Sequence, residues 1–72
     1  MNPEEKRHTV ANILQEARFA KRMSQQELAT LMKCQKQTIS NIETGKYSPN
    51  ADFLYQLLDF LDVSLFLNYK KI

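Results

Sequence analysis

Apolar residues recur every three or four positions over most of the chain, which is the spacing of the buried face of an α-helix. The first such set is Val10, Ile13, Leu14, Ala17 and Ala20. Ahead of it, Asn2-Pro3-Glu4-Glu5 has the composition of a helix start, with a capping amide, a proline and two acids. Thr9 is a second possible cap. The pattern predicts a first helix that ends at about Lys21.

Two shorter helices are predicted between the first helix and a glycine at position 45. Ser24-Gln25-Gln26-Glu27 fits a capping box, in which a serine and a glutamate three residues later satisfy each other's backbone N–H. The apolar face of this helix consists of Leu28, Ala29, Leu31 and Met32. After a turn at Lys33-Cys34, the next helix is expected from about Gln35 to Thr44, ahead of Gly45 as a natural C-terminal stop. Its inward residues are Ile39 and Ile42.

A fourth helix is predicted after a loop at Lys46-Tyr47-Ser48-Pro49. Asn50 is placed to cap this helix. Its apolar residues follow the i, i+3, i+4 spacing of a buried helix face. They are Phe53, Leu54, Leu57, Leu58 and Leu61. The sequence thus predicts an all-α domain of four helices at residues 1–62.

The tail at residues 63–72 follows a different pattern. Val63, Leu65, Leu67 and Tyr69 occupy every second position of this segment. Such an alternation, in a segment rich in β-branched and aromatic residues, predicts a β-strand. A lone strand has unpaired backbone groups at its edges, so we expect it to pair with the same strand of a second copy. The alternative is a fifth helix that packs on the core. The expected dimerisation residues are Val63, Leu65, Phe66, Leu67 and Tyr69.

Charge is unevenly distributed along this chain of 72 residues, whose net charge is +2. Between Arg18 and Lys46 there are six basic residues and two acidic ones, whereas the segment from Asp52 to Asp62 has three acids and no base. A basic middle segment suits a polyanionic partner, although an ordinary solvated surface has the same composition.

Several other classes of protein are disfavoured by the composition. No apolar run approaches the roughly 20 residues of a membrane span, and the acidic N-terminus does not have the apolar stretch of a signal peptide. The single cysteine, Cys34, cannot form an internal disulfide, so we expect a cytoplasmic protein in which Cys34 is a small buried residue. One histidine, His8, and one cysteine are too few ligands for an ordinary metal site, so we expect none. We also expect no cofactor and no enzymatic activity.

The third predicted helix carries amide, basic and hydroxyl groups on the face that its apolar residues leave free. These groups belong to Gln35, Lys36, Gln37, Ser40 and Asn41. In the major groove of DNA, glutamine matches the hydrogen-bonding pattern of adenine and lysine matches that of guanine. This helix is therefore a candidate for reading DNA bases, and an ordinary polar surface is the alternative.

Residues 24–45 resemble the helix-turn-helix of the lambda-repressor/Cro (XRE) family, and the resemblance extends over about Val10 to Leu61. It rests on Ser24-Gln25, Leu28-Ala29, Thr38-Ile39-Ser40, Ile42-Glu43, Gly45 and Pro49. It implies a lambda-repressor-like domain that binds double-stranded DNA. The base-contacting residues would be Gln35, Lys36 and Gln37, with Ser40 and Asn41 one turn further along.

The same resemblance implies contacts with the DNA backbone. The glutamine that opens the second helix, here Gln25, would touch a phosphate and brace the third helix, which is the recognition helix of the family. Arg18 would bridge Glu43 and a phosphate. The full predicted phosphate-contacting set is Arg18, Arg22, Gln25, Lys33, Thr38, Thr44, Lys46 and Tyr47. The family usually has glycine at the positions of Arg22 and Lys33, so these basic replacements are candidates for additional phosphate contacts.

A helix-turn-helix domain followed by one apolar strand, here at Asp62-Val63-Ser64-Leu65-Phe66-Leu67, resembles HipB-type antitoxins. The resemblance implies a homodimer that represses its own operon at a pseudo-palindromic operator and binds a HipA-type serine/threonine kinase toxin. The half-sites of such an operator lie about 34–36 Å apart. Two alternatives remain: a stand-alone repressor of phage or restriction-controller type, and a protein-interaction module that does not bind DNA.

Overall fold

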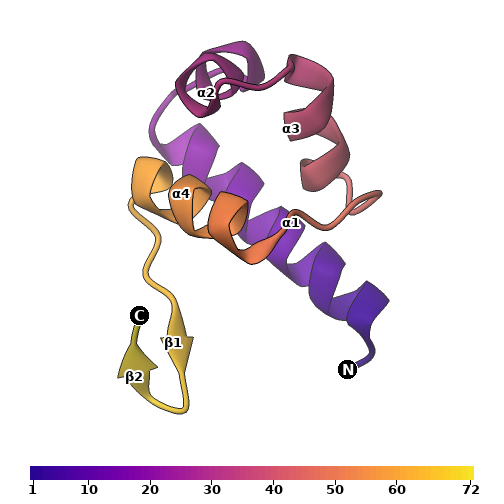
Figure 1. The fold of residues 1–72 in the computed structure, drawn as a ribbon, viewed down its shortest axis with the longest axis vertical. Helices are drawn as coiled ribbons and strands as arrows, with labels where there is room; N and C mark the ends of the chain where they lie inside the picture. The colour runs from indigo at the N-terminus through magenta and orange to yellow at the C-terminus, as the bar shows by residue number, and fades with distance from the viewer.

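The computed structural model describes residues 1–72 as four helices followed by a small β-hairpin (Figure 1). The helices are α1 (Pro3–Ala20), α2 (Gln25–Met32), α3 (Lys36–Glu43) and α4 (Ala51–Leu61), and the strands are β1 (Phe66–Leu67) and β2 (Lys70–Lys71). The predicted fold class, a four-helix lambda-repressor-like domain, is confirmed. None of the helices has both the length and the apolar character needed to cross a lipid bilayer.

Side-chain caps set the beginnings of three helices. Asn2, Ser24 and Asn50 each accept a hydrogen bond from the backbone N–H three residues further on. At α2 the predicted capping box is complete, because Glu27 also accepts from the Ser24 N–H at 3.0 Å. Thr9, the second possible cap, lies inside α1 instead and donates to the Glu5 carbonyl at 3.0 Å. Local sequence chemistry therefore determines where these helices start.

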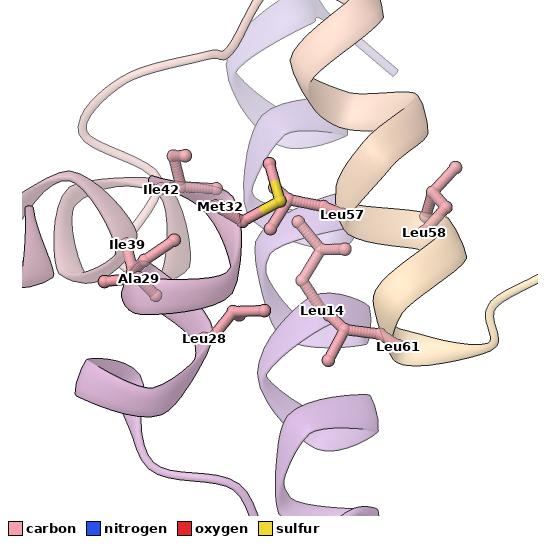
Figure 2. Close-up of a cluster of buried hydrophobic side chains, with 9 residues drawn as sticks. All are labelled: Leu14, Leu28, Ala29, Met32, Ile39, Ile42, Leu57, Leu58 and Leu61. Carbon is pink, nitrogen blue, oxygen red and sulfur yellow. The ribbon is translucent and has the colours of Figure 1, made fainter. Parts of the chain in front are cut away.

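All four helices contribute to one hydrophobic core (Figure 2). In Figure 1, α4 crosses α1, and α2 and α3 lie together at the end of the molecule away from the hairpin. The buried members of the core are Leu14, Leu28, Ala29, Met32, Ile39, Ile42, Leu57, Leu58 and Leu61. Because α3 contributes only its inner side to this core, its opposite side is left facing outward.

The buried face of α1 differs from the predicted apolar stripe. Leu14 is buried as expected, but Val10 and Ile13 are 37% and 46% exposed, while Ala11 and Arg18 are buried. The apolar stripe of this helix is wide, and the neighbouring helices cover only one side of it. They cover the side with Arg18 because this charged residue has a buried acidic partner on α3.

The tail contains a strand, as the alternating pattern predicted, and not a fifth helix. The strand is shorter than expected, and it pairs in an antiparallel register with a second strand of the same chain, so that Leu67 lies opposite Lys70. The turn residues Asn68 and Tyr69 have φ of 52° and 70°. Two positive φ values are typical of a type I′ hairpin turn, which usually contains glycine. A tyrosine at this position gave no sequence signal for the hairpin.

The predicted dimerisation residues fall into two groups in the structure. Val63 and Leu65 are half-buried and pack against the helical core. Phe66, Leu67 and Tyr69 are 59%, 57% and 98% exposed. The first group helps to complete the core of the monomer, and the second group has the larger exposed apolar surface.

Candidate nucleic-acid interface

A tight turn joins α2 to α3. Lys33 ends α2 in the left-handed conformation, with φ 55° and ψ 44°, and the Cys34 N–H then donates to the Ala29 carbonyl at 3.0 Å. Gln35 has extended backbone angles and caps α3 without a side-chain hydrogen bond. The helix therefore starts at Lys36, one residue later than predicted, and the amide of Gln35 is not needed for capping.

Cys34 lies partly buried against the core beside this turn. Burial raises the pKa of its thiol, because removal from water disfavours the charged thiolate. The protonated thiol behaves as a small apolar group, which is the role that the sequence analysis gave to this residue.

A buried ion pair fixes α3 to α1. Arg18 Nε and Nη2 donate to the two carboxylate oxygens of Glu43 at 2.7 and 2.9 Å, and each residue is only 5% exposed. Arg18 Nη1 donates to the Met23 carbonyl at 2.8 Å. The hydrogen bond to Glu43 raises the pKa of Arg18 despite the opposing effect of burial. The two hydrogen bonds between Arg18 and Glu43 hold the C-terminal end of α3, the recognition helix, at a fixed distance from α1.

The predicted role of Arg18 at a phosphate is constrained by this arrangement. All three guanidinium nitrogens already donate to protein oxygens, and the side chain is 7% exposed. Gln25 Nε2 joins the same cluster through a hydrogen bond of 3.1 Å to Glu43 Oε1, which links α2 to α3. Contacts of Arg18 and Gln25 with DNA remain predictions, whereas their bracing of α3 is visible in the structure.

The predicted base-contacting residues lie at the start and on the outer side of α3. Gln35, Lys36 and Gln37 are exposed, and Ser40 and Asn41 are half-buried. Ser40 and Asn41 each lie about one helical turn after Gln37, so both neighbour it on the helix surface. Gln37 Nε2 donates to Asn41 Oδ1 at 2.9 Å, a pairing that the sequence analysis missed although its i, i+4 spacing is a known signal.

The other predicted phosphate-contacting residues flank this helix. Lys46 and Tyr47 follow it and are exposed, and Thr38 is half-buried in its first turn. Thr44 is exposed, but its hydroxyl donates to the Ser40 carbonyl at 2.9 Å. Lys46 and Tyr47 therefore have the freest side chains after the recognition helix.

Arg22 and Lys33 occupy the two positions at which the family usually has glycine, and the backbone at both is left-handed. Both residues have φ of 55°, and both are exposed. A residue with a Cβ is strained in this conformation by about 1 kcal/mol relative to glycine. The chain thus has two strained positions at which the side chain is a cation that points to solvent.

We expect that replacing Lys33 with glycine raises the free energy of unfolding by about 1 kcal/mol, because the strain is relieved. If Lys33 meets a phosphate, the slope of log K against log[salt] should also fall by about 0.9. Denaturant titrations and binding titrations at several salt concentrations measure the two effects.

The matched control is Lys33→Gln, which removes the charge and keeps the Cβ. It should lower the salt slope in the same way without stabilising the fold. A salt slope that neither substitution changes would show that Lys33 does not contact DNA.

The loop after α3 depends on a contact that the sequence did not reveal. Gly45 has φ of 74°, and a Cβ at this position would collide with the imidazole of His8. The positive φ favours glycine here, whereas the exposed imidazole of His8 would only have to move aside to make room for a Cβ. His8 therefore covers the end of the recognition helix, where the sequence analysis gave it no role.

Comparison with protein families agrees with this geometry. A family model described as helix-turn-helix matches residues 14–67, which include α2, the turn and α3. No curated protein matches the chain. The match covers well over half of the sequence and includes Arg18, Gln25 and Glu43 as well as the helix-turn-helix itself. The chain belongs to the helix-turn-helix family of XRE type, and it is a DNA-binding transcription regulator whose partner is double-stranded DNA.

Proposed function

We propose that the protein is a sequence-specific repressor that acts as a homodimer and places α3 of each protomer in the major groove of one half of a pseudo-palindromic operator. The observation that carries this proposal is the bracing of α3 from behind by the cluster of Arg18, Glu43 and Gln25. Side chains that distinguish bases must be held in a defined position, and a helix fixed by buried hydrogen bonds provides it.

In this proposal the bases are contacted by the outer residues of α3. These are Gln35, Lys36, Gln37, Ser40 and Asn41. The DNA backbone is held by groups on either side of the helix, namely Arg18, Arg22, Gln25, Lys33, Thr38, Thr44, Lys46 and Tyr47. The backbone contacts position the protein, and the base contacts determine its sequence preference. The proposed mechanism consists of binding to DNA and includes no enzymatic step.

Selection of bound sites from random DNA, followed by gel shifts at two salt concentrations, tests the proposal. A selected site should show two-fold symmetry, and its affinity should fall by about 10³ or more between 50 and 200 mM salt if six or more phosphates are contacted. Lys36→Ala should weaken the selected site more than random DNA. Binding that is absent, or that does not respond to salt, would instead favour an interaction module without DNA binding.

We further propose that the repressor is the antitoxin of a type II toxin–antitoxin pair and holds a HipA-type kinase toxin. Support comes from the apolar tail after α4, which resembles HipB-type antitoxins, and from the surface next to it. A hollow of about 540 Å³ lies between α4 and the tail. Its lining includes Tyr55, Leu58, Asp59, Val63, Leu65 and Ile72. The hollow combines apolar side chains with charges of both signs, from Asp59, Asp62 and Lys71, and such a surface is suited to a protein partner.

The stand-alone repressor is the second candidate function, and it is supported by the complete helix-turn-helix alone. The two candidates differ in one observable. The antitoxin should co-purify with the product of a neighbouring kinase-like gene and should suppress its toxicity. A genomic neighbourhood without such a gene, or failure of the two products to associate, would leave the stand-alone repressor.

A further inference from the structure

The outer face of α3 carries one pair of amide side chains that are hydrogen-bonded to each other. Gln37 Nε2 donates to Asn41 Oδ1 at 2.9 Å, while Gln35 makes no side-chain capping bond. We propose that Gln37 and Asn41 act as one unit that selects an A·T base pair, with Gln37 bound to the adenine and Asn41 holding Gln37 in position. This inference rests on the proposed function, because it assigns a base to a helix that the proposal places in the major groove.

The assignment to adenine follows from the hydrogen-bonding groups that remain. A neutral glutamine amide has two N–H donors and one carbonyl oxygen. In the structure one donor of Gln37 is used by Asn41, which leaves one donor and the oxygen. Adenine presents one acceptor, N7, and one donor, N6, in the major groove, whereas guanine presents two acceptors. One donor beside one acceptor matches adenine and mismatches guanine.

Asn41 is a positioning residue in this unit. It is half-buried on the helix, one turn after the exposed Gln37. A glutamine side chain on a surface ordinarily samples many rotamers, and its immobilisation opposes binding. The bond to Asn41 removes part of this freedom before DNA arrives. The helix thus presents an oriented amide at this point, next to Lys36, whose ammonium group is flexible.

The test compares the sites that the wild-type chain and three variants select from random double-stranded DNA. The wild type should select adenine at one position of each half-site. Gln37→Glu keeps the shape and offers only acceptors, so that position should change to cytosine, whose N4 is a donor. Asn41→Ala keeps Gln37 but frees its amide, so discrimination at the same position should fall by less than the roughly 5- to 150-fold that a whole amide–base pair provides.

Gln35→Ala is the matched control, because it removes an amide of α3 that takes no part in the pair. Because the proposed function also places Gln35 at a base, this substitution should change selection at that other position and leave the adenine position unchanged. Thermal melts of all variants establish that each is folded.

Three results would overturn the inference while the repressor proposal survives: selection of guanine at the Gln37 position, no response of that position to Gln37→Glu, or full retention of discrimination in Asn41→Ala. If the folded wild type selects no sequence at all, the proposed function fails and the inference fails with it.

Discussion

Replacing Glu43 with alanine should lower the free energy of unfolding by about 3–5 kcal/mol. The substitution leaves the guanidinium of Arg18 buried without its anionic partner, and Gln25 loses its acceptor as well. Arg18 is only 5% exposed, so water cannot easily replace the lost carboxylate. A domain of this length has a total stability of about 4–11 kcal/mol, so the variant should be near the limit of folding. Urea titration followed by circular dichroism measures the loss.

Two further variants separate the charge from the shape of the pair. Glu43→Gln keeps one acceptor oxygen and the side-chain volume, so it should lose less stability than Glu43→Ala. The double substitution Arg18→Met with Glu43→Leu removes both charges and should recover most of the loss, because replacing a whole buried pair with apolar groups is often neutral. A loss below about 1 kcal/mol in Glu43→Ala would show that the pair behaves as an exposed one.

Replacing both Phe66 and Leu67 with serine should convert the proposed dimer into a monomer and lower operator affinity by about 10²–10⁴-fold. These residues are 59% and 57% exposed, so the substitution removes little packing within the monomer. Joining two half-site contacts in one dimer multiplies affinity without new contacts, and this advantage is lost when the protomers separate. Sedimentation and gel shifts on a selected two-half-site operator measure both effects.

The control is Leu31→Ser, which removes another apolar side chain that is 45% exposed. Leu31 belongs to α2, which lies at the opposite end of the molecule from the hairpin in Figure 1. It should leave the dimer intact. A wild-type chain that stays monomeric at tens of micromolar, or a double variant that stays dimeric, would contradict dimerisation through the hairpin. The half-buried Val63 and Leu65 are left unchanged because they complete the core.

Much of the fold was predictable because the signals for it are local. The caps Asn2, Ser24 and Asn50 accept hydrogen bonds from residues only three positions away, so their function does not depend on the rest of the fold. The left-handed backbone at Lys33 had only an indirect signal, namely the glycine that the family usually has at this position. Family membership was also predictable, since the motif lies within one continuous segment.

The outward position of the predicted base-contacting residues and the pairing of Arg18 with Glu43 were predictable, the second of them from the family resemblance, whereas the burial of that pair was not. The sequence indicated that Gln35, Lys36 and Gln37 would face outward, and they are exposed. It did not show that Arg18 and Glu43 would be buried, because they are 25 residues apart and charged residues are rarely buried without a partner. The hairpin was missed because Tyr69 gives no signal for positive φ.

The sequence by itself determined where α1, α2 and α4 start and which side of α3 faces outward. Those properties depend on hydrogen bonds and apolar spacing within a few residues, and such interactions are set by local composition. The tertiary structure alone decided that α1 turns Arg18 inward rather than Ile13, and that β1 pairs with β2. These choices depend on which distant surfaces meet, because burial of a charge or pairing of a strand requires a partner supplied by another part of the chain.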